Sequence, residues 1–245
     1  MSPETIFDRY LVSQTDLDSG ALTRLGVIVH QLSDVGRFEA KVVRGGRSEG
    51  SFSVMVSEES HSAQARIDLS HPEAEAKACE CGADHAYEVM PKGYLVLLVS
   101  EGPGGHSVLL GPSDDPKATP FDSTQLMGGD RFAITILRPG TYGVSNVLTG
   151  AEARIKVAYP RVGRRPSAPP KPVQIACTEQ GFVPSEANVR AGQGLVYVCR
   201  TSSRIVIRLL EPDDRAPNSE RRLLAGWSRP SAREATRARA RPRQR

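Results

Sequence analysis

The side chains best suited to chemistry are concentrated in the stretch HPEAEAKACECGADH, residues 71–85. Its metal-ligand types are His71, Cys79, Cys81 and His85. Thiolate and imidazole groups are the ligands that zinc and cuprous ions prefer, and Cys-x-Cys on an extended segment directs both sulfur atoms to the same side. His106 could join this group through the fold. The spacing is not the Cys-x-x-Cys pair of structural zinc sites, so the alternative is two ordinary thiols beside solvated histidines. Copper or zinc is the only cofactor for which the sequence offers candidate ligands.

Cys177 and Cys199 are a second pair of thiols, on two segments with strand-like alternation. If these segments are neighbouring strands, a disulfide between them is geometrically possible. The first residues, MSPETIFDRYLVSQTD, are acidic and contain no apolar stretch, so we expect no secretory signal and a cytoplasmic location. Buried cysteines stay reduced in that compartment, and the alternative to a disulfide is therefore a pair of small apolar core residues.

Nucleophilic catalysis finds little support in the sequence. Ser107 follows His106 directly, so on a strand the two side chains point to opposite faces and cannot pair. The chain contains no HExxH, Walker-type or GxGxxG motif. Adjacent carboxylates in proline-containing turns fit turn capping better than acid–base catalysis; they are Asp114 with Asp115 and Asp213 with Asp214. We therefore expect a protein that is not an enzyme.

The net charge of +4 comes from the C-terminal end of the chain. Between Arg215 and Arg245 ten arginines and two glutamates give a charge of +8, so the rest of the chain carries −4. The arginine-rich tail could bind nucleic acid or an acidic partner, although it has no aromatic side chain for base stacking after Trp227. The alternatives are a solvated, disordered tail and an aberrant end from a shifted reading frame, since Arg, Ala, Pro and Ser predominate where the strand pattern stops. The longest apolar run, Tyr94–Val99, is too short for a membrane span.

Strand-like patterns extend over most of the chain, and the strands that they predict must position the side chains named above. Alternating apolar and polar residues predict a hairpin over 38–56, and the glycines of its turn, RGGR at 44–47, suit positive φ. Further short strands are predicted at 65–69, 94–99, 106–110, 132–137, 141–145, 153–159, 173–177, 195–200 and 205–209. The proline-rich stretch PRVGRRPSAPPKP interrupts them as a linker. Residues 1–36 have helix-like apolar spacing and predict one or two short helices.

Several of these segments resemble the cupredoxins. KGYLVLLVSEGPGGHSVLL (92–110) is similar to the element that delivers the first copper-binding histidine of that family. RFAITILRPGTYGVSN (131–146) is similar to the later element that leads to the copper-binding cysteine, and ARIKVAYP (153–160) would be the closing strand. GFVPSEANVRAGQGLVYVC (181–199) resembles the opening of a second unit of the same kind.

The resemblance implies a cupredoxin-like fold that lacks the type-1 copper site. Such a site needs two histidines, a cysteine thiolate and usually an axial methionine. His106 matches the first histidine, but Asn146 stands at the position of the cysteine, and no His or Met follows within the next dozen residues. The second unit contains no histidine. We therefore expect a fold kept for its shape, without electron transfer.

Together these observations predict a mainly β protein, a cupredoxin-like Greek-key β-sandwich with a partial second β unit and a disordered C-terminal tail. The predicted divisions are a short helical segment (1–36), a hairpin region with the Cys/His loop (37–85), the sandwich (86–160), the linker (161–172), the partial unit (173–213) and the basic tail (214–245). The predicted function is non-catalytic binding or scaffolding, in which strand edges hold a protein partner or a second copy of the chain. Metal binding through Cys79, Cys81 and His85, and binding of nucleic acid or an acidic partner through the tail, are the alternatives.

Overall fold

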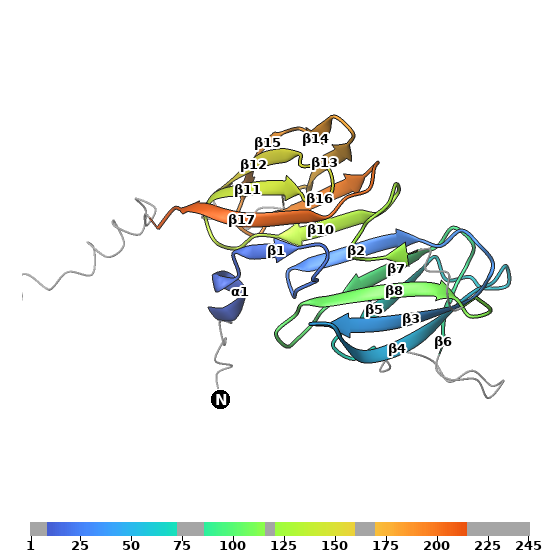
Figure 1. Cartoon of the computed structure of the whole chain (residues 1–245). Helices are drawn as coiled ribbons and strands as arrows, with labels where there is room; N and C mark the ends of the chain where they lie inside the picture. Colours follow the sequence, from blue (N-terminus) through green and yellow to red (C-terminus); the bar gives the residue numbers. More distant parts are fainter. Residues whose placement is uncertain (1–8, 73–85, 116–120, 160–169, 215–245) are drawn as a thin grey trace, which may run out of the picture. The chain divides into compact units, whose positions relative to one another are not determined.

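The chain is built from short strands in which buried and exposed side chains alternate (Figure 1). The computed structural model describes residues 9–72, 86–115, 121–159 and 170–214. Its strands pair into one seven-stranded and two five-stranded sheets. The alternation directs every second side chain into a single hydrophobic core and leaves the others toward solvent.

The seven-stranded sheet is called the shared sheet here, because both halves of the chain contribute to it. Its strand order is β14 (Gly181–Val183), β13 (Val173–Thr178), β16 (Gly194–Cys199), β10 (Arg131–Thr135), β2 (Gly26–Gln31), β7 (Tyr94–Leu98) and β5 (Gln64–Asp68). The first outer sheet has the order β6 (Ala86–Val89), β4 (Arg47–Val56), β3 (Gly36–Arg44), β8 (His106–Pro112) and β9 (Phe121–Asp122). The second outer sheet has the order β1 (Asp16–Asp18), β17 (Ile205–Pro212), β11 (Gly140–Asn146), β12 (Glu152–Ala158) and β15 (Glu186–Arg190).

The strands that the period-two pattern predicts are present, although it does not predict β1, β6, β9, β14 or β15. The helix-like spacing near the N-terminus is right only in part. The predicted hairpin is β3–β4, and Gly45 and Gly46 in its turn have φ of 56° and 79°, which glycine adopts without strain. Within 1–36 a short helix, α1 (Arg9–Ser13), does form. Residues 26–31 form the strand β2 instead of a second helix, because the β-branched run Val27-Ile28-Val29 suits a buried central strand better.

The chain alternates between the shared sheet and an outer sheet. From β2 it passes to β3 and β4, returns to the shared sheet at β5, leaves it for β6, returns at β7 and leaves again at β8. Strands from successive passages pair in parallel, as β5 does with β7 and β4 with β6. This winding makes the molecule a β-solenoid of about four turns, and the predicted Greek-key sandwich is wrong.

The strands between residues 86 and 160 do not form a sandwich of their own within the described chain. Among them, β6, β8 and β9 belong to the first outer sheet, β7 and β10 to the shared sheet, and β11 and β12 to the second outer sheet. Strands from 37–85 and from 173–213 complete those same sheets. Alternation of apolar and polar residues predicts that a segment is a strand, but it does not predict which strand pairs with it. A cupredoxin-like order of segments therefore does not imply cupredoxin-like strand pairing.

Two stretches of the chain repeat the same order of pairings. Repeat 1 contains β1 to β8 (16–112), and repeat 2 contains β9 to β17 (121–212). In each repeat a hairpin, β3–β4 or β11–β12, has an antiparallel partner on one side, β8 or β17, and a parallel partner on the other, β6 or β15. The backbone repeats as well, since Gly36 and Gly140 begin equivalent strands with φ of 147° and 153°. An internal duplication therefore organises this part of the chain.

The first strand of each repeat lies on the outer sheet of the other repeat. β1 pairs with β17 of repeat 2, beside which it lies in Figure 1, and β9 pairs with β8 of repeat 1. The equivalent strands β2 and β10 pair with each other in the shared sheet. This reciprocal exchange and the β2–β10 pair join the two repeats.

Candidate binding groove

Three of the predicted metal ligands, Cys79, Cys81 and His85, lie outside the described residues. His71 is exposed, and its Nε2 forms a hydrogen bond with the Glu101 carboxylate. Among the residues that the structure describes, no three His, Cys, Asp or Glu side chains are grouped so that they could hold a metal ion. The metal hypothesis therefore rests on the sequence of the 79–85 segment alone.

His106 and Asn146, which the cupredoxin resemblance places in one site, belong to different sheets. His106 begins β8 in the first outer sheet, and Asn146 ends β11 in the second. His106 is 5% exposed, and its Nδ1 has no hydrogen-bond partner among the described residues. Burial, assisted by the positive charge of Arg44, lowers the pKa of His106. The side chain is thus held in its neutral form inside the fold.

Asn146 has a structural role at the end of the β11–β12 hairpin. Its side-chain Oδ1 accepts hydrogen bonds from Leu148 N at 3.2 Å and Arg204 N at 3.0 Å. Its Nδ2 donates to Ser203 Oγ at 3.2 Å. A buried amide with these partners fixes the turn, as is common for asparagine.

Cys177 and Cys199 lie directly opposite each other in the parallel strands β13 and β16. Both are free thiols, and each is 1% exposed. A hydrogen bond with Cys177, together with burial, raises the pKa of Cys199, so this thiol stays protonated. The expectation that the two segments are neighbouring strands is confirmed. A disulfide between Cys177 and Cys199 stays a prediction, which this pairing of the strands permits.

The remaining catalytic candidates lie at strand ends. The Ser107 hydroxyl donates to the Val43 carbonyl oxygen at 3.4 Å, so its proton is directed to the backbone. Asp114 and Asp115 follow the end of β8, and Asp213 and Asp214 follow the end of β17. Asp114 lies in a turn, as predicted, whereas Asp213 and Asp214 lie in irregular chain, where Asp213 N donates to the Pro139 carbonyl oxygen at 3.1 Å.

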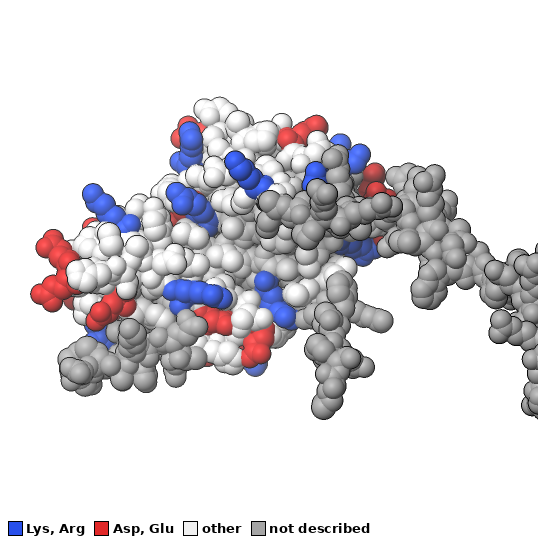
Figure 2. All heavy atoms as spheres, turned by 180° about the vertical axis from the view of Figure 1, so that it is seen from behind, with Lys and Arg blue, Asp and Glu red and all other residues white. Residues whose placement is uncertain are grey.

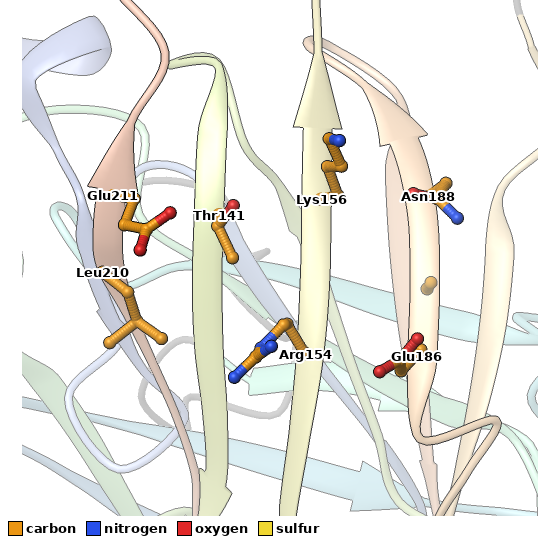
Figure 3. Close-up of a pocket in the computed structure, with 8 residues that line it drawn as sticks. Thr141, Arg154, Lys156, Glu186, Asn188, Leu210 and Glu211 are labelled. Atoms are coloured by element: carbon orange, nitrogen blue, oxygen red, sulfur yellow. The ribbon is translucent and has the colours of Figure 1, made fainter.

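A polar groove lies on the solvent-facing side of the second outer sheet (Figure 3). It consists of two hollows, of about 340 Å³ and about 240 Å³, that share Arg154 and Leu210 in their walls. The residues that line it come from β17, β11, β12 and β15; the principal ones are Thr141, Gly143, Ser145, Glu152, Arg154, Lys156, Glu186, Asn188, Arg208, Leu210 and Glu211. This set is called the groove below.

Strand alternation produces the shape of the groove. Tyr142 and Val144 of β11 are buried in the core, so Thr141, Gly143 and Ser145 face the other way. These three small residues form the floor. Long side chains on the neighbouring strands β12 and β17 form the walls, because their outward positions carry Arg, Lys, Glu and Leu.

The corresponding position of repeat 1 carries a long side chain instead of a glycine. Pairing aligns Gly143 with Glu39, the corresponding residue of β3. The Glu39 carboxylate binds Arg37 Nε at 3.0 Å and accepts a hydrogen bond from Ser113 Oγ at 3.4 Å. A side chain at Gly143 would meet the tip of Leu210 first, with a Cβ 3.2 Å from Leu210 Cδ1. Glycine at this position of repeat 2 therefore leaves room for the Leu210 side chain beside β11.

The charged side chains of the groove have no ion-pair or hydrogen-bond partner among the residues that the structure describes. Arg154 and Glu186 are opposite each other on β12 and β15, yet they form no ion pair in the described chain, and Figure 3 shows Arg154 extending away from Glu186 toward β11. Lys156, Arg208 and Glu211 are likewise exposed and make no side-chain hydrogen bond to a described residue. Unpaired charges of both signs therefore line one hollow surface.

The described surface does not offer an extended basic field on the face drawn in Figure 2. Basic and acidic side chains of the described residues are interspersed there. A folded nucleic-acid-binding surface has clustered basic residues. The nucleic-acid alternative thus still depends on the arginine-rich tail, most of which, 215–245, lies outside the described residues.

The groove was missed at the level of sequence, although one signal was present. A glycine inside a strand weakens it and often marks a place where a ligand or another chain approaches closely. Gly143 interrupts the alternation of β11 in this way, but the sequence does not show which strands flank it. Without β12 and β17 beside it, Arg154 and Arg208 cannot be recognised as its neighbours.

None of the helical structure in the described residues reaches the length and apolar character that a membrane span requires. Comparison with known protein families, with curated proteins and with solved structures finds no match to this chain.

Proposed function

We propose that this protein is a non-catalytic binding protein whose groove holds an extended segment of a partner protein. The observation that carries the proposal is the set of unpaired charged side chains on a hollow, rigid sheet face. In the equivalent sheet of repeat 1, Arg37 and Glu39 form an ion pair with each other. Charges that are left unpaired at a concave surface are available to a partner.

The shape of the groove favours an extended polar segment over a compact small molecule. Small-molecule sites are enclosed and lined mainly by apolar side chains with a few polar groups. The groove is open, crosses four strands and is lined by polar and apolar groups in about equal share. Its described lining residues include neither His nor Cys, so the usual nucleophile–base pairs have no place in it.

The test is a selection of peptides on the purified full chain from a library of random seven-residue segments. Enriched peptides should bind the wild-type chain. The variant Gly143→Glu places in the groove the residue that repeat 1 carries, and it should lower the affinity for these peptides at least tenfold. Glu39→Gly is the matched control in repeat 1 and should leave the affinity within twofold. Enrichment of no peptide, or equal binding by Gly143→Glu, would contradict the proposal.

A further inference from the structure

The groove contains a row in which two arginines flank a glycine. Gly143 is paired with Arg154 on one side and with Arg208 on the other. Neighbouring strands are about 4.8 Å apart, so the two arginine backbones are separated by about 10 Å. Gly143 contributes no side chain between them, and the exposed side chain of Leu210 lies nearest to it. The smaller hollow, of about 240 Å³, lies over this row, and Ser145 adds a hydroxyl to it. This row is called the arginine notch below.

Both guanidinium groups of the arginine notch are available. Neither Arg154 nor Arg208 has an ion pair or side-chain hydrogen bond with a described residue, and both side chains are exposed. Figure 3 shows Arg154 directed from β12 toward β11, the strand that contains Gly143. Guanidinium groups offer planar, paired donors that match a carboxylate.

The corresponding row of repeat 1 has the opposite distribution of charge. There Glu39 occupies the central position and faces Gly111 on β8 and Ser53 on β4. The structure thus contains one row with a carboxylate in the middle and small residues beside it, and a second row with arginines beside a glycine, against which the exposed Leu210 side chain lies. A carboxylate that entered the arginine notch from outside would displace the Leu210 side chain and stand over Gly143, where Glu39 stands in repeat 1.

We infer that the arginine notch binds the carboxylate of an aspartate or glutamate side chain in the partner's extended segment. The inference rests on the proposed function and specifies the chemistry of its ligand. The carboxylates at the rim, Glu152, Glu186 and Glu211, oppose a polyanion such as a phosphodiester chain but tolerate one acidic residue with basic neighbours. The preferred segment is therefore an acidic residue flanked by basic ones, in extended conformation.

The test uses the peptides enriched on the full chain, each resynthesised with every Asp or Glu replaced in turn by its amide. At one acidic position the replacement should weaken binding about tenfold. Arg208→Gln and Arg154→Gln should each weaken binding of the parent peptide to a similar degree. They should lower the affinity for the amide peptide by less than twofold, because the interaction with the carboxylate is already lost. Arg208→Gln changes an exposed side chain, and an unchanged thermal unfolding midpoint confirms that this variant is folded.

Failure of the inference and failure of the proposed function give different results. If the enriched peptides lose affinity in Gly143→Glu but bind equally well as amides, the groove binds segments and the carboxylate assignment is overturned. If their binding is insensitive to Gly143→Glu, both are overturned. Single-stranded DNA of the same length is the competing polyanion, and its binding at the notch with higher affinity than the acidic peptides would also overturn the assignment.

Discussion

Asp18 of repeat 1 binds Arg204 of repeat 2 through both carboxylate oxygens, with Oδ2 2.9 Å from Nη2 and Oδ1 3.2 Å from Nε. The same Oδ1 accepts a hydrogen bond from Gly20 N at 2.8 Å. The equivalent residue of repeat 2, Asp122, accepts from Thr124 N at 2.8 Å but has its second partner within its own turn, the Thr124 hydroxyl. One turn motif thus links the two repeats at Asp18 and remains local at Asp122.

Removing Asp18 should therefore destabilise the protein in a salt-dependent way. We expect Asp18→Ala to lower the free energy of unfolding by about 1–2 kcal/mol, since hydrogen bonds to a charged group are lost and the half-exposed ion pair adds little. Asp122→Ala, the matched control, should cost about 1 kcal/mol and respond less to salt. Urea unfolding at low and high salt measures both values. Identical salt dependence in the two variants would contradict a link through Arg204.

Asp130 and His30 form a second link between the repeats. His30 Nδ1 lies 2.7 Å from Asp130 Oδ1, and Asp130 Oδ2 accepts from Met127 N at 2.8 Å. The Asp130 side chain is almost fully buried, and its loss leaves two partly buried donors, His30 Nδ1 and Met127 N, without this partner. We expect Asp130→Ala to lower the free energy of unfolding by about 3 kcal/mol. The exposed Asp34→Ala is the control, with an expected change below about 0.5 kcal/mol; a similar effect of the two changes would refute the link.

Stability should decline as the pH falls below the ordinary histidine pKa of 6.5, because of His106. Burial, with the nearby Arg44 charge, lowers the pKa of His106 in the folded state, so the unfolded chain binds the proton first as the pH falls. The window opens near 6.5 and extends down to the folded pKa. His106→Gln should flatten the dependence of the unfolding free energy on pH in this window. Parallel profiles for the variant and the wild type would show that His106 is not responsible.

Cys177 and Cys199 should react with a thiol reagent only after unfolding. In a Cys79→Ser, Cys81→Ser chain they are the two remaining cysteines, and each is 1% exposed in the folded state. We expect slow labelling of the native chain by a disulfide reagent and full labelling in denaturant. Rapid labelling of the native chain would contradict their burial, and a mass lower by two hydrogens before labelling would reveal the disulfide.

The sequence predicts the strands well and their partners poorly, for a physical reason. Alternation around Phe38, Tyr142 and Ile207 depends on neighbours along the chain, so it can be recognised in one dimension. The pairing of β1 with β17 joins residues at opposite ends of the described chain, and no local pattern encodes it. The two repeats share a turn sequence, LDSGAL at 17–22 and FDSTQL at 121–126. This similarity is short, and it does not by itself predict the duplication.

The candidate site follows the same division. Cysteine and histidine are conspicuous in a sequence, and the pattern of copper ligands singles out His106 and Asn146, the latter at the position of the cysteine. The fold places these two residues on different sheets. Arg154, Gly143 and Arg208 are common residues, and only the pairing of β12, β11 and β17 makes them one notch. Chemistry that depends on cross-strand register cannot be found before the register is known.

The most direct test of the account is to map an enriched peptide on the isotope-labelled full chain by NMR. We predict that amide shifts concentrate on β11 at Thr141, Gly143 and Ser145, and that the side-chain Nε–Hε signals of Arg154 and Arg208 move with them. Equivalent residues of repeat 1, such as Arg37 and Glu39, should stay unchanged. Shifts that fall instead on the first outer sheet, or on the tail after Asp214, would contradict the groove as the binding site.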